Sequence, residues 1–253
     1  MMLAVILAAG SGRRIQNFWT GPKGLIRLGD LTLVEEAIIR LRAVGVDRIL
    51  IVTGYKANEY DMIISNWAGV EAIFNPRHSD SGSMYSLCCA RPYVDSSFLL
   101  LDSDLIFELR ALHALIKCNA SDCVLISGPR GAGDEAYVQT REGLFVQASK
   151  CRPDLSSVDG ELVGISKLSS QFFDIMIELT MSDALLPTTD YDFVGFVRAA
   201  AIEPLVCCKI EDLVWSEIDD QSQFNFASLI HAKLKPELEN LMLQLGVRSR
   251  SRN

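Results

Sequence analysis

The chain has 253 residues, of which 49% are hydrophobic, and a formal net charge of −8. This length and composition predict one α/β domain that buries a sizeable core. The negative charge argues against a nucleic-acid partner, which would require a basic face, but it does not exclude a bound triphosphate, because local charge decides that. No segment reaches the ~20 apolar residues of a membrane span, so we expect no membrane partner and a cytoplasmic location.

Strand and helix patterns alternate over the first half of the chain. Short apolar runs predict strands, and apolar residues at helical spacing predict helices between them. Strands separated by helical crossovers imply a mostly parallel central sheet with helices on both faces. The predicted fold class is therefore α/β, a Rossmann-like three-layer sandwich. The predicted strands cover 3–7, 48–52, 71–74, 98–101 and 123–126, and the predicted helices cover 33–44, 59–67 and 108–117.

The second half of the chain has a different pattern. Two short segments flank Arg141-Glu-Gly143, which predicts a β-hairpin. Because we find neither a repeat nor a linker, residues 1–253 form one predicted domain. Within it, residues 135–205 are expected to form a small lid over the carboxyl edge of the sheet, where open α/β sheets bind ligands. Strands are predicted at 136–139, 144–148, 162–165, 205–210 and 214–218, and helices at 169–181, 191–201 and, as more than one helix, 221–245.

Seven cysteines are spread along the chain, including the adjacent pairs Cys88-Cys89 and Cys207-Cys208. Adjacent cysteines within one element rarely bond to each other, and the total is odd. The chain also has three histidines and no Cys-x-x-Cys. The sequence therefore favours buried, reduced thiols over a zinc site.

The first predicted strand runs directly into the turn Gly10-Ser-Gly12, and Arg14 and Lys23 follow. Glycine lets a polyphosphate approach the backbone, whose free N–H groups hold anions, and the two cations can neutralise its charge. The spacing of a P-loop is absent, and Ile15 stands where a dinucleotide fingerprint needs its third glycine. An ordinary glycine turn with solvated cations is the alternative, but the Pro22-Lys23 pair favours the phosphate-binding interpretation.

Two groups of acids follow predicted strands. Asp102 and Asp104 come at the end of the central strand, and they point the same way if that strand continues. Asp219 and Asp220 follow a late strand. Each acid could instead cap the next helix. Because hard carboxylate oxygens suit Mg²⁺ bound together with substrate phosphates, the acids and the first turn together favour a Mg²⁺ site.

A polar loop between residues 75 and 87 leads into a short helix that starts near Ser83. The hydroxyl and N–H groups at such a start can bind a base or a phosphate. Taken alone, this segment favours a capped helix with a polar lead-in over a binding loop.

The opening Leu-Ala-Ala-Gly-x-Gly-x-Arg, followed by Pro-Lys, resembles the signature of the nucleotidyltransferase superfamily of the MobA-like and sugar-phosphate type. The resemblance implies the nucleotide-diphospho-sugar transferase fold and a first loop that holds the nucleobase and triphosphate. Asp104 and Asp219 match the two metal positions of that superfamily, so Mg²⁺ is the implied cofactor. Asp102 and Glu217 are implied neighbours of the metal ligands.

Two later motifs narrow the resemblance. Gly82-Ser-Met-Tyr-Ser-Leu87 and Gly160-Glu-Leu-Val-Gly-Ile-Ser166 are similar to segments of the CTP-dependent cytidylyltransferases that act on 2-aminoethylphosphonate or phosphocholine. The resemblance extends over residues 3 to about 225. It implies transfer of CMP from CTP to a small phosphonate or phosphate monoester with an ammonium head, 2-aminoethylphosphonate being favoured, and release of pyrophosphate.

Roles for individual residues follow from this resemblance and from the needs of an ammonium head, which are carboxylates or aromatic faces. The expected catalytic residues are Arg14, Lys23 and Lys150. The expected nucleotide-binding residues are Leu7, Ala8, Ala9, Gly10, Ser11, Gly12, Arg14, Lys23, Ser83, Ser86 and Asp102. The expected acceptor-binding residues are Glu135, Tyr137, Lys150, Asp190, Tyr191 and Asp192.

Several alternatives stay open at this point. Lys150 suits a solvated surface lysine equally well, and residues 189–192 suit a capped helix start. The acceptor could be phosphocholine, a sugar 1-phosphate or a molybdopterin-type compound. A non-catalytic nucleotide-binding regulator and an NAD-binding dehydrogenase are the rival classes, the latter disfavoured by the missing third glycine. A homodimer is possible.

Overall fold

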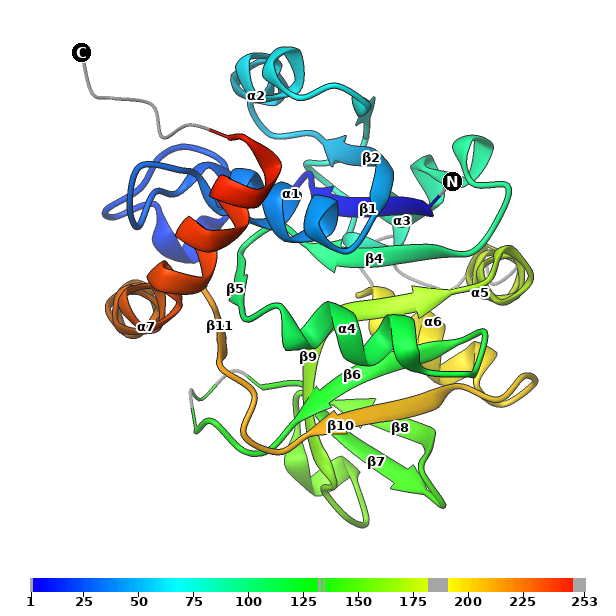
Figure 1. Ribbon diagram of the computed structural model, residues 1–253. Helices are drawn as coiled ribbons and strands as arrows, with labels where there is room; N and C mark the ends of the chain where they lie inside the picture. The colour runs from blue at the N-terminus through cyan, green and yellow to red at the C-terminus, as the bar shows by residue number, and fades with distance from the viewer. Residues whose placement is uncertain (1, 132, 134, 182–190, 248–253) are drawn as a thin grey trace.

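Apolar strands and helices build a three-layer α/β sandwich, as the sequence predicts (Figure 1). The computed structural model describes residues 2–131, 133, 135–181 and 191–247. Its helices are α1 (Leu33–Ala43), α2 (Asp61–Asn66), α3 (Ser83–Cys89), α4 (Arg110–Lys117), α5 (Ser170–Met181), α6 (Asp192–Ala199) and α7 (Gln221–Leu245). Its strands are β1 (Met2–Ala8), β2 (Val46–Thr53), β3 (Val70–Phe74), β4 (Phe98–Asp102), β5 (Leu105–Phe107), β6 (Cys123–Ser127), β7 (Tyr137–Arg141), β8 (Leu144–Ser149), β9 (Gly160–Leu168), β10 (Val206–Ile210) and β11 (Trp215–Glu217).

Within the described residues, nine strands form the central sheet in the order β3-β2-β1-β4-β9-β6-β10-β8-β7. The strands β3, β2, β1, β4, β6 and β10 run in one direction. β9 is antiparallel to both of its neighbours, β4 and β6. The sheet is therefore mostly parallel, as predicted, with one reversed strand inside it. The reversal is physically simple, because the hairpin β7–β8, and no crossover helix, connects β6 to β9.

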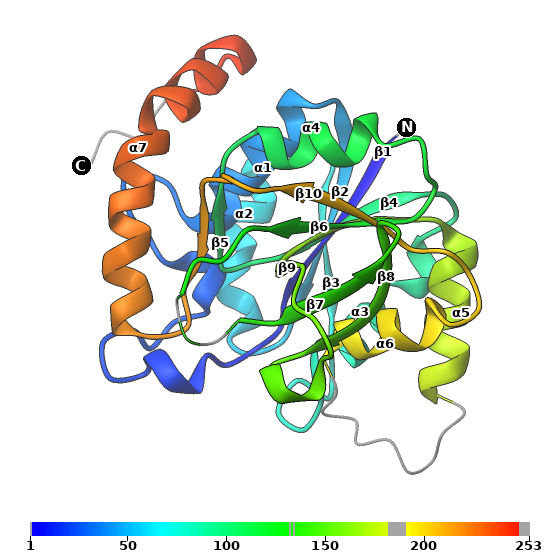
Figure 2. The ribbon, with the colours of Figure 1, turned by 90° about the horizontal axis from the view of Figure 1, so that it is seen from below.

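Alternating side chains of β1 divide the core into two layers. Ala4 and Ile6 face α1, α2 and α4, whereas Leu3 and Val5 face α3, α5 and α6. Figure 2 shows α1 and α4 on one side of the sheet and α3, α5 and α6 on the other. Because both faces are covered, β1 is apolar at every position, which explains the continuous apolar run in the sequence.

The end of the chain departs from the prediction in two ways. The predicted late strand is β11, which lies outside the central sheet and pairs antiparallel with β5. The predicted terminal helices are one helix, α7, which contains Pro236 and packs on α1 through a contact group that includes Ile39, Leu238 and Leu241. None of the helices in the described parts of the chain combines the length and apolar character needed to cross a membrane.

The range 135–205 contributes to more than a lid. β9 lies inside the sheet, and α5 belongs to the helical layer that covers it. β7 pairs with β8 on one side and with β9 on the other, so Tyr137 lies opposite both Ser149 and Glu161. The hairpin turn lies at the opposite edge of the sheet, where Leu144 pairs with Val206 at the start of β10, so only the open end of the hairpin and the start of α6 lie near the carboxyl edge. The division into one domain with a lid stays a prediction.

Candidate functional site

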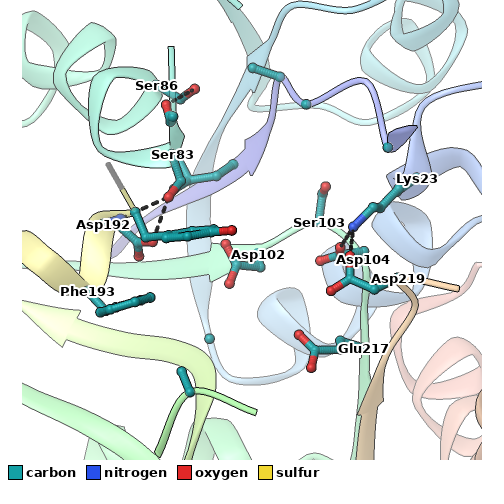
Figure 3. Close-up of a pocket in the computed structure, with 18 of the residues that line it drawn as sticks. Lys23, Ser83, Ser86, Asp102, Ser103, Asp104, Asp192, Phe193, Glu217 and Asp219 are labelled. Atoms are coloured by element: carbon teal, nitrogen blue, oxygen red, sulfur yellow. Dashed lines mark hydrogen bonds and ion pairs between the residues drawn. The ribbon is translucent and has the colours of Figure 1, made fainter. Parts of the chain in front are cut away.

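Strand ends at the carboxyl edge of the sheet surround a cavity of about 360 Å³ (Figure 3). β1 and β4 are adjacent and parallel, so the loops that follow them lie side by side at this edge. The loop before α3, the N-terminus of α6, part of β9 and the end of β11 complete the wall. The cavity therefore lies where the sequence predicts a nucleotide site.

The turn after β1 has the backbone of an open, glycine-dependent loop. Gly12 has a φ of 57°, in the left-handed region that favours glycine, and a Cβ added there would lie 2.9 Å from Cγ of Lys23. Ala8 packs in the core, and neither Ala8 nor Ser11 is among the residues that line the cavity. The other predicted nucleotide-binding residues do line it: Leu7, Ala9, Gly10, Gly12, Arg14, Lys23, Ser83, Ser86 and Asp102.

The short ladder between β5 and β11 brings the two predicted metal ligands together. Leu105 pairs with Glu217, so Asp104 just before β5 comes close to Asp219 just after β11. Lys23 then joins the two acids: its Nζ donates to Oδ2 of Asp104 at 2.8 Å and also to Oδ1 of Asp219. Nη2 of Arg14 lies 2.7 Å from Oδ2 of Asp219. Four predicted site residues from three distant parts of the chain thus meet at one point.

Lys23 contacts two carboxylates, so its single positive charge cannot neutralise both. Burial opposes the charge of Lys23, but the carboxylates of Asp104 and Asp219 overcome this effect and raise the pKa of Lys23. Burial and the Asp104 carboxylate raise the pKa of Asp219, whereas Lys23 and Arg14 act against this rise. Burial and the carboxylates of Asp104 and Asp219 raise the pKa of Glu217 to about 7. Because Asp219 and Glu217 have raised pKa values although Lys23, Arg14 and Arg130 contact these acids, a further cation beside them would be favourable.

The helix-cap alternative applies to Asp220 and not to its neighbour. Asp220 caps α7, because its Oδ1 accepts a hydrogen bond from the N–H of Gln223 at 2.8 Å. The N–H of Asp219 donates to Oε1 of Gln223, which leaves the Asp219 carboxylate for Lys23 and Arg14. Leu109, and not Asp104, occupies the cap position of α4.

Two further acids, Asp102 and Asp192, also line the cavity. β4 ends at Asp102 and a turn follows, so the condition under which Asp102 and Asp104 would point the same way, a continuous strand, is not met. In Figure 3 Asp102 lies between Asp192 and the contact of Lys23 with Asp104 and Asp219. Burial, then the carboxylates of Asp192 and Asp104, raise the pKa of Asp102 well above its usual range. Burial also raises the pKa of Asp192, against its hydrogen bond from Ser83.

The middle loop and the lid are connected by one reciprocal hydrogen-bonded pair. Oγ of Ser83 donates to Oδ1 of Asp192 at 2.8 Å, and the N–H of Asp192 donates back to Oγ of Ser83 at 2.9 Å. The N-termini of α3 and α6 are joined in this way. Ser86 lines the same wall, where its Oγ accepts from Nδ2 of Asn75 at 3.0 Å and donates to the carbonyl of Gly82 at 3.3 Å.

The predicted acceptor-binding residues separate into two groups. Lys150, Tyr191 and Asp192 line the cavity, and Nζ of Lys150 lies 5.1 Å from the centre of the Tyr191 ring. Glu135 and Tyr137 are not among the lining residues, because Glu135 turns to the N–H of Gly133 at 2.9 Å and to the hydroxyl of Tyr137 at 3.2 Å. The remaining predicted residue, Asp190, lies outside the described residues.

Glu217, expected only as a neighbour of the metal ligands, lines the cavity and has its own support. Nη2 of Arg130 lies 3.1 Å from Oε1 of Glu217, and the Arg130 guanidinium stacks 3.7 Å above the ring of Trp215. The N–H of Arg130 also donates to Oε1 of Glu161 at 2.9 Å. This cation is buried behind the site and holds the Glu217 carboxylate toward it.

Several lining residues were missed at the level of the sequence. Gly164 lies inside a motif that the resemblance had already singled out, and its φ of +78° and its contact with Asp102 explain why glycine stands there. Gly82, Leu162 and Val163 also lie inside such motifs, and His78 and Ser81 lie in the polar loop before α3, so the sequence offered a signal for these residues as well. The missed residues are Arg13, His78, Ser81, Gly82, Ser103, Ala136, Leu162, Val163, Gly164 and Phe193.

A comparison with protein families decides the assignment. Residues 4–251 match the profile of the MobA-like NTP transferase domain. The chain belongs to this family. The resemblance inferred from the motifs is thereby confirmed, and the glycine turn and the acids Asp104 and Asp219 of this NTP transferase chain lie in one cavity.

Individual relatives cover this NTP transferase chain to different extents. A choline-phosphate cytidylyltransferase of Streptococcus pneumoniae is 30% identical over 108 residues, which are 42% of this chain and 47% of that protein. A CMP-5'-(3-aminopropyl)phosphonate synthase of Streptomyces rubellomurinus is 24% identical over 246 residues, which are 88% of this chain and 38% of that protein. The chain thus spans less than half the length of these curated relatives.

Solved structures show the same fold. The inositol-1-phosphate CTP transferase of T. maritima superposes with a TM-score of 0.80 at 21% identity, covering 93% of this chain and 96% of that one. The CTP:phosphocholine cytidylyltransferase of Streptococcus pneumoniae gives a TM-score of 0.73 at 18% identity, covering 91% of this chain and 99% of that one. The predicted nucleotide-diphospho-sugar transferase type of fold is confirmed.

Proposed function

We propose that this NTP transferase moves CMP from CTP to a small phosphonate or phosphate monoester with an ammonium head, 2-aminoethylphosphonate being favoured. The observation that carries the proposal is the convergence of Asp104 and Asp219 on Lys23 beside the glycine turn. The relatives named above support cytidine as the base, because both names specify transfer of a cytidine nucleotide. Those names also join a phosphorus group to a nitrogen-bearing chain.

Mg²⁺ fits the residues at this point. Asp104 and Asp219 offer hard oxygen donors that already share a cation, the ammonium of Lys23, and the pKa of Asp219 is raised by burial and by its acidic neighbour. We infer that these two carboxylates would hold Mg²⁺. When bound, Mg²⁺ would neutralise phosphate charge and orient the α-phosphate.

The residues of the chain supply positioning and charge, and the reaction needs no protein nucleophile. An oxygen of the acceptor forms a bond to the α-phosphorus of CTP, the bond to the β-phosphate oxygen breaks, and pyrophosphate leaves with that electron pair. The backbone N–H groups of the Gly10–Gly12 turn would hold the phosphates, and Arg14 and Lys23 would balance the charge that grows on the leaving group. Lys150 would hold the phosphorus group of the acceptor.

The acid pair Asp102 and Asp192 supports an ammonium head. Asp102, which the resemblance assigned to the nucleotide, has its pKa raised by burial and then by the Asp192 carboxylate, so we reassign it to the ammonium head of the acceptor. A primary ammonium donates three hydrogen bonds and carries the charge that this pair lacks. A sugar phosphate has no such head, so it leaves the two carboxylates uncompensated.

Phosphocholine is the second candidate, and the aromatic wall favours it. Tyr191 and Phe193 stack at 5.3 Å with an angle of 10° between their planes, and Phe193 also lines the cavity. An aromatic face attracts a quaternary ammonium, which cannot donate hydrogen bonds to carboxylates. We therefore expect the relative contributions of the Asp192 carboxylate and of the Tyr191 and Phe193 rings to binding to determine which acceptor is preferred.

Pyrophosphate release tests the proposal. The purified protein is assayed with each of CTP, UTP, ATP and GTP in the presence of Mg²⁺. Each nucleotide is paired with 2-aminoethylphosphonate, phosphocholine, glucose 1-phosphate or no acceptor. We expect release only with CTP, fastest with 2-aminoethylphosphonate, and loss of that release when Mg²⁺ is chelated.

Two neighbouring acids provide a matched pair of variants. Asp219→Asn should abolish turnover, whereas Asp220→Asn retains the helix-capping oxygen and should keep near-normal rates. Asp192→Asn should reduce kcat/KM for 2-aminoethylphosphonate more than for phosphocholine. Tight CTP binding without pyrophosphate release for any acceptor would instead identify a nucleotide-binding regulator and refute the proposal.

A further inference from the structure

Three cysteine side chains converge on the face of the sheet that α4 covers. Cys118 follows α4, Cys123 begins β6 and Cys208 lies within β10, and their sulfur atoms all lie within 4.8 Å of one another. None of the three is among the residues that line the nucleotide cavity. The group belongs to a different part of the molecule from the proposed active site.

The fold holds all three positions. β6 and β10 are parallel with Cys208 opposite Leu125, so Cys208 and Cys123 project from the same face of the sheet. The carbonyl of Cys118 accepts a hydrogen bond from Nζ of Lys167 at 2.7 Å, which fixes the end of α4 above the strands. Three rigid elements, and no loop tip, thus position the sulfur atoms.

Sγ of Cys123 donates to the carbonyl of Leu115 in α4 at 3.9 Å, which holds this side chain between the strand and the helix. Cys123 is fully buried, whereas Cys118 and Cys208 are partly exposed, so a small ion can reach the group from solvent.

We propose that Cys118, Cys123 and Cys208 form a binding site for one soft, thiophilic divalent cation of the Zn²⁺ class. Zinc–sulfur bonds of about 2.3 Å place neighbouring thiolates at roughly 3.8 Å, a spacing that these sulfur atoms reach by small side-chain rotations. Binding forms three metal–sulfur bonds and releases the thiol protons to solvent. Within the described residues no histidine or carboxylate joins the group, so water takes the fourth position.

The sequence argues against this site because the three cysteines have no metal-type spacing. The adjacent pair Cys207-Cys208 contributes only one sulfur, since consecutive strand residues face opposite sides of the sheet. The site depends on the register between β6 and β10, which no local pattern reveals.

Cadmium titration of the reduced protein tests the proposal. The protein is kept anaerobic with a phosphine reductant and excess Mg²⁺, and thiolate-to-cadmium absorption in the ultraviolet reports binding only by sulfur, so a cation on the carboxylates is not detected. Competition with a chelator then gives the affinity for Zn²⁺. We expect one equivalent of Cd²⁺ and of Zn²⁺ per chain.

Single substitutions separate this group from the other thiols. Cys208→Ser and Cys118→Ser should each weaken Zn²⁺ binding by on the order of 100-fold, at the upper end of what loss of a supporting contact costs. Cys151→Ser, at an exposed thiol, should have no effect. Cys118→Ser changes a residue after a helix and keeps the protein measurable if the strand variant does not fold.

Three results would overturn the proposal. These are the absence of thiolate-to-cadmium absorption, equal Zn²⁺ affinity in Cys118→Ser and the unsubstituted protein, and loss of binding in Cys151→Ser. Formation of a disulfide on exposure to air, without metal uptake by the reduced protein, also counts against it. Pyrophosphate release should be unchanged in Cys118→Ser, so metal binding by the thiols and the transferase activity are tested independently.

Discussion

Replacing Glu217 with glutamine should change how the stability of the free protein depends on pH. Burial and two neighbouring carboxylates raise the pKa of Glu217 from 4.5 to about 7 in the folded state. A tenfold change in proton affinity corresponds to ~1.4 kcal/mol, so the folded protein loses about 3 kcal/mol when this carboxyl ionises. Glutamine keeps an oxygen for Arg130 and removes the ionisation.

The sign follows from proton binding. Below pH 4.5 both the folded and the unfolded chain carry the proton on Glu217, and between 4.5 and about 7 only the folded chain retains it. The free energy of unfolding must therefore fall as the pH rises through this window and then level off. Urea unfolding of the ligand-free protein at pH 5 and pH 8 measures the fall. Glu217→Gln should decrease that fall by as much as about 3 kcal/mol.

A residual fall in the variant is expected, because burial also raises the pKa values of Asp219 and Asp102. Glu239→Gln, at an exposed carboxylate on α7, is the control and should behave like the unsubstituted protein. If Glu217→Gln has the same pH dependence as the unsubstituted protein, or is less stable at pH 8, the charge balance deduced for the site is wrong.

Three further substitutions test other contacts. Lys23→Met removes the cation that joins two acids and should lower kcat with saturating CTP by about 100-fold or more; a kcat within twofold of normal would contradict this role. Arg130→Met removes the cation beside Glu217, so the acid limb of the pH–rate profile should move to higher pH, and an unmoved limb would exclude this positioning role. Gly164→Ala puts a Cβ 2.5 Å from Oδ2 of Asp102, so the KM for the acceptor should rise more than the KM for CTP. Urea unfolding should show a stability loss of ~1–3 kcal/mol. An increase confined to the KM for CTP would reassign Asp102 to the nucleotide.

The parts of the site that follow single strands could be predicted from the sequence. The turn with Gly12 and the acid Asp104 each come directly after an apolar run, and a strand end in an α/β sheet has a known place. Asp219 could be assigned by its motif, but its approach to Asp104 depends on the ladder between β5 and β11, which is a tertiary contact.

The remaining features depend on directions and contacts that local patterns do not encode. The short apolar sequence of β9 fits a parallel strand as well as an antiparallel one. Only the hairpin that precedes it in the chain makes β9 antiparallel to its neighbours. Glu135 is acidic and near the lid in sequence, yet the N–H of Gly133 and the hydroxyl of Tyr137 draw it away from the cavity. Nothing in the sequence distinguishes Arg130 from the other arginines, and only the structure shows that it stacks on Trp215.

The two hydrogen bonds between Ser83 and Asp192 couple the expected binding of the nucleotide to the expected binding of the acceptor. Ser83 begins the helix beside the expected base, and Asp192 begins the helix beside the expected ammonium head. A ligand that draws the Asp192 carboxylate toward itself also frees the Ser83 hydroxyl. By reciprocity, the first substrate to arrive must then change the affinity for the second by the same factor as in the opposite order.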